Sequence, residues 1–240
     1  MNNYKTVFFT IGVLLIILGA FMLIPFFIQF IYGEENNTFL SSALVTTFMG
    51  ILLVLTNLEE NRKLNLQQTF LLTTLSWLSI AIFGCIPFLL SDLNLSFVDS
   101  FFESMSGITT TGSTIITYLD NAPKSILIWR AILQWLGGIG VIVMAITILP
   151  LLNVGGMQLF RMESSDTTEK ILPRTREVTL IISIIYLVLT FSCGIAYWTV
   201  GMNIFDSIAH SMTTIATGGF STYSGSIGYF QNPKIEVVSI

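Results

Sequence analysis

Charged residues are scarce in this sequence of 240 residues: Asp, Glu, Lys and Arg together make up 10% of it, while hydrophobic residues make up 53%. The uncharged stretches are longer than the roughly 20 residues that a helix needs to cross a bilayer. Five such runs occur: Thr6 to Gly33, Asn36 to Leu58, Leu64 to Ser91, Ala131 to Phe160 and Val178 to Phe205. This pattern excludes an ordinary soluble domain, and we expect an all-α polytopic membrane protein.

Cysteine and histidine are nearly absent, with two cysteines and a single histidine. Cys85 and Cys193 both lie inside apolar runs, where a packing role is commoner than a disulfide or a metal pair. No group of His, Cys, Asp and Glu has the spacing of metal ligands, so we expect neither an enzyme nor a bound cofactor. A net charge of -4 with no basic stripe argues against nucleic-acid binding.

The sequence does contain a repeat. The stretch from Phe97 to Thr114 returns in altered form at Phe205 to Thr222, and placing Ser104 over Ser211 gives an offset of 107 without a gap. Each copy has about ten helix-compatible residues followed by a run of Thr, Ser and Gly. Ten helical residues cover about 15 Å, roughly half of the hydrocarbon layer. We therefore expect two half-helices that enter the membrane without crossing it.

The start of each half-helix is marked by a capping side chain three residues ahead of an acid, Ser96 before Asp99 and Asn203 before Asp206. The partially negative C-terminus of each half-helix should then point toward the Thr/Gly run and favour a cation.

The Thr/Gly runs themselves carry no charged residue over positions 107–117 and 211–228. Non-helical backbone at membrane depth is tolerated only where it is buried in protein or lines a water-filled cavity. Uncharged carbonyl and hydroxyl oxygens are the candidate ligands that remain, and they suit a monovalent cation that must lose its water and then be released. Gly112 and Gly219 would permit the backbone angles that turn carbonyls inward.

We divide the chain into four parts. Residues 1–63 form a two-span hairpin, and residues 64–152 form a first pore unit of span, pore half-helix, filter loop and span. Residues 153–176 form a cytoplasmic linker, and residues 177–240 form a second pore unit that looks truncated in its last span. With the amino terminus in the cytoplasm, seven of the ten basic residues fall on cytoplasmic segments, in line with the positive-inside rule.

Several motifs resemble the TrkH type of potassium uptake proteins, within the Trk/Ktr/HKT superfamily of potassium transporters. They are ESMSGITTTGST (103–114), WRAILQWLGGIGVIV (129–143), GGMQLFRMES (155–164), LPRTRE (172–177) and HSMTTIATGGFSTYSGSIGYF (210–230). The resemblance implies selective potassium uptake across a bacterial inner membrane, through a fold of four pore units of which this sequence, resembling the amino-terminal half, holds two. It also implies a homodimer on cytoplasmic nucleotide-binding regulatory subunits of the TrkA type, which the linker would contact.

Carried over by position, the resemblance makes Gly112 and Gly219 the glycines of two selectivity-filter loops. Potassium, the transported substrate, would bind at the carbonyls of Thr110, Thr111, Thr217 and Gly218. Because sodium-selective members tend to have serine at the first of those glycines, Gly112 favours potassium.

Other interpretations remain open. The Thr/Gly runs are also compatible with an ion-coupled carrier of a small solute with discontinuous helices, or with a non-conducting scaffold. His210, which replaces Glu103 in the second copy, is expected to bond to nearby backbone more readily than to sense protons. Arg130 is expected to snorkel or to pair with an acid such as Glu103, and Gly137 and Gly138 to mark close helix packing.

Overall fold

The computed structural model describes residues 4–34, 37–58, 64–152 and 171–240. Within these ranges every regular element is helical. The long helices are α1 (Lys5–Tyr32), α2 (Thr38–Thr56), α3 (Leu66–Gly84), α6 (Lys124–Leu152) and α8 (Ile171–Thr199). The short elements are α4 (Ile86–Leu89), α5 (Phe97–Ile108), α9 (Ile204–Ile215), α10 (Pro233–Ser239) and two 3-10 turns, η1 (Leu119–Asn121) and η2 (Ser226–Phe230). The all-helical prediction is confirmed.

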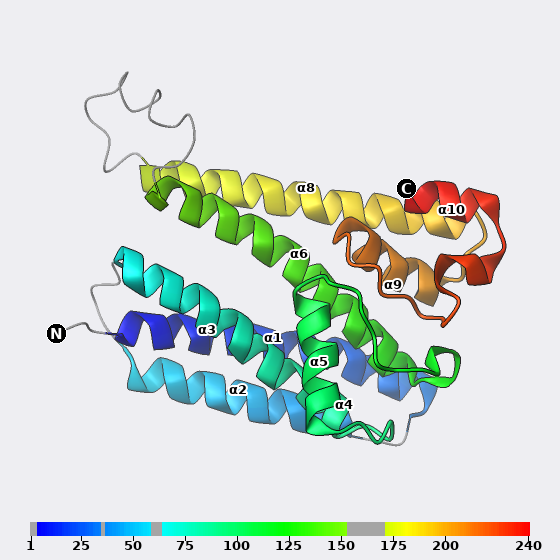
Figure 1. The fold of residues 1–240 in the computed structure, drawn as a ribbon, viewed down its shortest axis with the longest axis horizontal. Helices are drawn as coiled ribbons and strands as arrows, with labels where there is room; N and C mark the ends of the chain where they lie inside the picture. Colours follow the sequence, from blue (N-terminus) through cyan, green and yellow to red (C-terminus); the bar gives the residue numbers. More distant parts are fainter. Residues whose placement is uncertain (1–3, 35–36, 59–63, 153–170) are drawn as a thin grey trace.

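Five helical segments of the described chain are long and apolar enough to cross a membrane, and each falls within or overlaps one of the five uncharged runs. The third combines α3 and α4, which form one span from Leu66 to Leu90. In Figure 1 the long helices lie side by side, the half-helix α5 stands upright near the middle of the view, and the half-helix α9 lies to its right. The N-terminus and the facing ends of α6 and α8 lie together at the left.

The predicted linker, residues 153–176, is only partly described. Residues 153–170 lie outside the described ranges, whereas α8 already begins at Ile171. Helix α6 is described as far as Leu152 and helix α8 from Ile171, so residues 171–176 of the predicted linker lie in α8. The predicted domain boundaries at 152 and 177 stay predictions.

The hairpin of α1 and α2 is held by close backbone contact. A Cβ atom added at Gly12 would lie 2.7 Å from the carbonyl oxygen of Gly50, and one added at Gly50 would lie 2.7 Å from that of Gly12. Small residues at such a crossing let two membrane helices approach and pack through their backbones. At the outer end of the hairpin, the Glu34 carboxylate accepts hydrogen bonds from the backbone N–H and the hydroxyl of Ser125.

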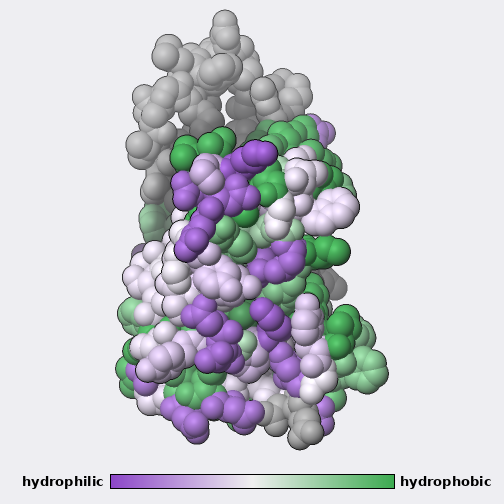
Figure 2. Space-filling model, turned by 90° about the vertical axis from the view of Figure 1, so that its right-hand side faces the viewer, coloured by the Kyte–Doolittle hydropathy of each residue, from purple (hydrophilic) through white to green (hydrophobic). Residues whose placement is uncertain are grey.

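That contact gives Glu34 a structural role at the start of α6, where unpaired backbone N–H groups favour a negative charge. The hairpin is therefore attached to the first pore unit as well as packed beside it. Figure 2 shows this end of the bundle, where hydrophilic residues gather over the face with apolar residues around its rim.

The two half-helices begin where the sequence predicts. Ser96 and Asp99 form a reciprocal capping box at the start of α5, and the Asn203 side chain accepts a hydrogen bond from the Asp206 N–H at the start of α9. Each half-helix has 12 residues, about 18 Å at 1.5 Å per residue. Although α5 extends to Ile108 rather than ending near Ser106, neither helix is long enough to cross the membrane.

Helix α6 is the centre of the packing. It contacts α1, α3, α5, α8 and α9, and its first half buries Trp129, Arg130, Ile132, Leu133 and Gln134 almost completely. Most of these side chains are apolar and contribute to the main hydrophobic core. The two polar ones, Arg130 and Gln134, need hydrogen-bond partners at this depth, and both find them in the pore units.

Candidate ion-conduction site

The loops that follow α5 and α9 have the same backbone conformation. We call residues 109–118 the first loop and residues 216–225 the second loop. Thr110 has φ of 56° and Thr217 has φ of 52°, while Gly112 has φ of 79° and Gly219 has φ of 80°. A left-handed conformation is uncommon for threonine and normally costs free energy. Its recurrence at the same offset of 107 residues shows that the repeat extends to the backbone path.

The hydrogen bonds that hold each loop to the end of its half-helix are also repeated. In the first copy the N–H groups of Thr110 and Thr111 donate to the carbonyls of Gly107 and Ser106, both at 3.0 Å. In the second copy the N–H groups of Thr217 and Gly218 donate to the carbonyls of Thr214 and Thr213, both at 2.9 Å. These bonds satisfy carbonyls that would otherwise be unpaired at a helix C-terminus, and they support the strained threonines.

The left-handed residues change the direction of the carbonyl groups. In a strand, successive carbonyls point to opposite sides, but a left-handed residue at every second position breaks this alternation. Such a backbone can present several oxygens toward one side, as a carbonyl-lined filter requires. The orientation of particular carbonyls toward an ion stays a prediction.

The two loops meet at Gly112 and Gly218. A Cβ atom added at Gly112 would lie 2.1 Å from the Gly218 carbonyl oxygen, so only glycine fits against the second loop here. Of the six predicted filter residues, the structure thus brings Gly112, Gly218 and Gly219 together. Among the six, Gly218 is buried, Thr110 and Gly112 are half-buried, and Thr111, Thr217 and Gly219 are exposed in this chain.

Gln134 on α6 binds the second loop on both sides of Gly219. Its Nε2 atom donates to the Gly218 carbonyl at 2.7 Å, and its Oε1 atom accepts from the Phe220 N–H at 3.0 Å. One of the two lone pairs of the Gly218 carbonyl is therefore used by the protein. That the other lone pair binds potassium stays a prediction.

Arg130, one turn before Gln134, joins the first half-helix to the second loop. Its Nε atom lies 2.7 Å from Glu103 Oε1, and the two side chains are 1% and 0% exposed. Its Nη1 atom donates to the Ser221 carbonyl at 2.8 Å, and the guanidinium lies 4.1 Å from the centre of the Phe220 ring. Of the interpretations of Arg130, the structure confirms the pair with Glu103.

Glu103 also anchors the first loop. Its carboxylate accepts hydrogen bonds from the Thr114 hydroxyl at 2.9 and 3.1 Å and from the Ile115 N–H at 3.0 Å. The buried charge therefore has an ionic partner and two further donors, which is the arrangement that makes a buried carboxylate tolerable.

Asp206 and His210 on α9 hold the second loop by different chemistry. Asp206 is fully buried and accepts from the hydroxyls of Thr222 at 2.7 Å and Tyr223 at 3.1 Å. Burial and the neighbouring negative charge of Asp206 raise the pKa of Tyr223 to about 12, so this hydroxyl stays protonated and donates at neutral pH. The acid that the sequence presents as a helix-start residue therefore also binds the loop.

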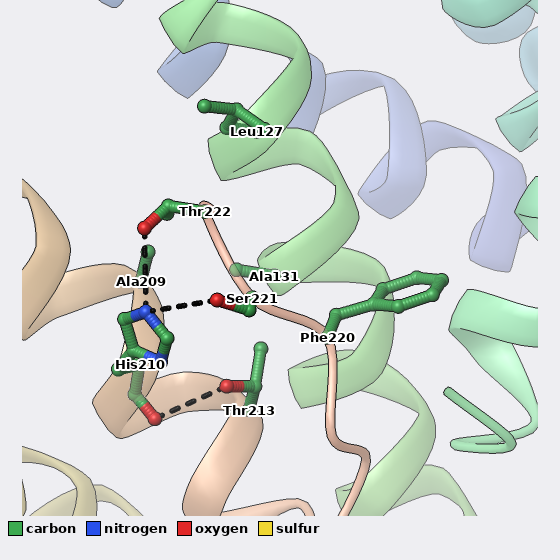
Figure 3. Close-up of a pocket in the computed structure, with 8 residues that line it drawn as sticks. All are labelled: Leu127, Ala131, Ala209, His210, Thr213, Phe220, Ser221 and Thr222. Carbon is green, nitrogen blue, oxygen red and sulfur yellow. Dashed lines mark hydrogen bonds between the residues drawn. The ribbon is translucent and has the colours of Figure 1, made fainter. Parts of the chain in front are cut away.

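The expectation that the His210 side chain bonds to nearby backbone is wrong. Its Nε2 atom lies 3.3 Å from the Thr222 hydroxyl and 3.5 Å from the Ser221 hydroxyl, as Figure 3 shows. The loop folds back along α9 and brings these hydroxyls to the ring, whereas the backbone groups around His210 are used within the helix. The gap between α6, α9 and the second loop has no room for a water molecule, so the side chains meet directly.

Gly137 and Gly138 let α6 contact the ends of both half-helices. A Cβ atom added at Gly137 would lie 1.9 Å from the Ile108 carbonyl oxygen, and one added at Gly138 would lie 3.1 Å from Ala216 Cα. Close packing, as the sequence predicts for these glycines, is therefore confirmed. The two free cysteines, Cys85 buried and Cys193 partly buried, also agree with packing roles.

The contact at Gly137 leads to a prediction. Gly137→Ala should force α5 away from α6 and destabilise the protein by about 1–3 kcal/mol, the range for an overpacked core. Gly140→Ala on the same helix is the matched control, because its Cβ would meet only Trp77, at 3.9 Å, and alanine favours a helix by about 1 kcal/mol. Thermal unfolding in detergent should show a lower midpoint for the first variant only. Equal midpoints for the two variants would contradict the contact.

The contact of Gln134 with the second loop was not predicted from the sequence. The available signal was a polar side chain within a long apolar run, four residues after Arg130 and so on the same helix face. Its partners in the second loop, 84 and 86 residues away, have no signal in the local sequence.

Paired spans, half-helices and left-handed loops define a polytopic membrane protein built from repeated pore-loop units. The chain belongs to the TrkH family of cation transport proteins, whose family model matches residues 34–240. It is 40% identical over 240 residues to the Trk system potassium uptake protein TrkH of Escherichia coli K12, a match that covers 98% of this chain and 50% of that protein. It is 39% identical to the protein of the same name from Vibrio parahaemolyticus, over 99% of this chain and 50% of the relative.

A solved structure has the same fold. The crystal structure of the potassium transporter TrkH from Vibrio parahaemolyticus superimposes with a TM-score of 0.89 at 38% sequence identity, and the match covers 100% of this chain and 48% of that one. The chain thus spans about half the length of the relatives that it matches.

Proposed function

We propose that this chain supplies two of four filter loops of a selective potassium uptake pathway across a bacterial inner membrane, with its amino terminus in the cytoplasm. The observation that carries the proposal is the repeated left-handed backbone at Thr110, Gly112, Thr217 and Gly219, in two loops that touch each other. Relatives at 40% identity are named potassium uptake proteins. The carbonyls of Thr110, Thr111, Thr217 and Gly218 are the proposed potassium ligands.

The electrostatics of the half-helices support a cation. The C-termini of α5 and α9 lead directly into the two loops, and each carries the partial negative charge of its helix. An inside-negative membrane potential would drive potassium inward, at about 2.3 kcal/mol per charge per 100 mV. In this proposal potassium is the substrate, and the chain needs no cofactor and performs no catalysis.

The repeat also bears on the alternative of a carrier with discontinuous helices. Inverted repeats would introduce their broken helices from opposite sides of the membrane. Here α5 follows the span of α3 and α4, and α9 follows α8, and both of these spans run from the left to the right of Figure 1. The shared direction favours a pore with rotational symmetry.

The assembly follows from the same proposal. Two further loops would come from a longer chain or another copy, and we propose a homodimer that binds a nucleotide-binding regulatory subunit of the TrkA type on the cytoplasmic side. Residues 153–170 of the proposed contact for that subunit, 153–176, lie outside the described residues.

The test is a flux measurement on the protein expressed from its own gene at full length. Cells that lack other potassium uptake should regain growth at low potassium and take up potassium in strong preference to sodium. A carrier would instead move a solute together with the ion, and a scaffold would produce no flux. Either of the last two results would overturn the proposal.

A further inference from the structure

The second loop is held in shape by a side chain of the other pore unit. Gln134 lies on the last span of the first unit and is 0% exposed. Its amide bonds to the Gly218 carbonyl and the Phe220 N–H, the two groups that flank the left-handed Gly219. A Cβ atom added at Gly219 would have no neighbour within 4 Å, so side-chain packing around this glycine does not fix its conformation.

We propose that Gln134 is a positioning residue that fixes the peptide groups on either side of Gly219 and thereby sets the cation selectivity of the second loop. This inference rests on the proposed function of the loop as part of a potassium filter. Gln134 does not touch the ion in this proposal, and it acts through the carbonyl and N–H that it binds.

The chemistry of the contact requires an amide. The loop presents one acceptor and one donor, so the group between them must donate and accept at once, with the reach of a glutamine side chain. Because Gln134 is fully buried, an N–H or carbonyl left unpaired beside it is costly. A side chain without these groups would leave both peptide groups unpaired, and the loop would turn to find other partners.

Arg130 strengthens the argument that the first unit positions the second loop. It lies four residues earlier on the same face of α6 and binds the carbonyl of Ser221, the residue after Phe220 in the second loop. Three backbone groups, at positions 218, 220 and 221, are thus bound from one face of α6. Gln134 differs from Arg130 in having no ionic partner, which makes its role separable from the buried ion pair.

The experiment compares Gln134→Met, Gln134→Glu and Ile128→Ala in the full-length protein, by potassium and sodium uptake and by protein amount in the membrane. Methionine keeps the size of glutamine but removes both hydrogen bonds. We expect the potassium-to-sodium uptake ratio to fall about tenfold, because the two peptide groups that lose their buried partner turn toward other partners and move the Gly218 carbonyl. Ile128→Ala opens the core of the same helix away from the loop, and should lower the protein amount but not the ratio.

Gln134→Glu gives an internal comparison, because a protonated carboxyl group can donate and accept as the amide does. The ratio should therefore be close to that of the unchanged protein at low pH, where the carboxyl is protonated, and fall as the group ionises. Other titratable or charged groups surround this region: Arg130 on α6, Glu103 on α5, Tyr186 on α8, Asp206 and His210 on α9, and Tyr223 in the second loop. The unchanged protein measured at each pH corrects for all of them.

Each result supports or overturns the positioning role of Gln134. An unaltered ratio in Gln134→Met, or a ratio in Gln134→Glu that does not vary with pH relative to the unchanged protein, would overturn the positioning role alone. If Gln134→Met does not reach the membrane, the pH comparison on Gln134→Glu still decides. Absence of selective potassium flux in the unchanged protein would instead overturn the proposed function, and this inference with it.

Discussion

Gly112→Ser is expected to lower the potassium-to-sodium uptake ratio by about tenfold or more, because a side chain here overpacks the contact between the two loops. The new Cβ would lie 2.1 Å from the Gly218 carbonyl oxygen, and the residue would also have to keep φ near +79°. Real Cβ atoms do not approach a backbone oxygen so closely, so one loop must move. Since the proposed filter consists of these two backbones, any movement changes the distances from its oxygens to the ion. Competition between sodium and potassium uptake in the full-length protein measures the effect.

A matched pair of alanine variants separates the contact from the backbone strain. Gly112→Ala and Gly219→Ala both place a Cβ atom on a left-handed residue, with φ of +79° and +80°, but only the first meets the other loop. The strain common to both is about 1–2 kcal/mol. Gly112→Ala should therefore reduce selectivity more than Gly219→Ala does. Equal losses in the two variants would show that the contact between the loops has no role.

Arg130→Met is expected to destabilise the protein by about 3–5 kcal/mol, because it leaves the buried Glu103 carboxylate without its ionic partner. Glu103→Gln should cost less, because the amide oxygen still accepts from Arg130 Nε and the Thr114 hydroxyl, and the guanidinium keeps the Ser221 carbonyl and the Phe220 ring as partners. Its remaining cost comes from the Ile115 N–H, which loses its carboxylate acceptor, and from the lost counter-charge of Arg130. The thermal unfolding midpoint in detergent and the protein amount in the membrane are the measurements. The asymmetry follows from the partners that remain, because Arg130 keeps the Ser221 carbonyl in Glu103→Gln, whereas Glu103 keeps its charge but no ionic partner in Arg130→Met.

The double variant Glu103→Gln with Arg130→Met tests the cause. Neutralising the carboxylate should recover most of the stability that Arg130→Met loses, leaving the cost of the unpaired Ser221 carbonyl, about 1–3 kcal/mol. If the double variant were as unstable as Arg130→Met, an uncompensated charge would not be the reason for the instability.

Much of the fold was predictable because its signals are local. Uncharged runs marked the spans, and Ser96 and Asn203 marked the half-helix starts, since a helix start needs an acceptor for its free N–H groups. The repeat placed both loops, and family membership is confirmed by the match over residues 34–240. The assignment of individual carbonyls to potassium remains a prediction.

The contacts that hold the loops were largely not predictable. Gln134, Asp206 and His210 bind groups whose approach depends on how α6 and α9 lie against the returning chain, and no local pattern encodes that arrangement. Arg130 is the exception, because a buried charge in a span requires an opposite charge nearby, and Glu103 was the available acid.

The agreement of the loop angles, 56° with 52° and 79° with 80°, has a consequence for the history of the protein. Tandem duplication of one ancestral segment accounts for two copies that share a backbone path while their anchoring side chains have diverged, as Glu103 and His210 have. Since α6 of one copy now anchors the loop of the other, the copies have become interdependent. A chimaera carrying the first segment twice would place Ser113 at the position of Phe220, whose ring packs against Arg130. Because serine cannot replace that contact, the two copies of the repeat are no longer interchangeable.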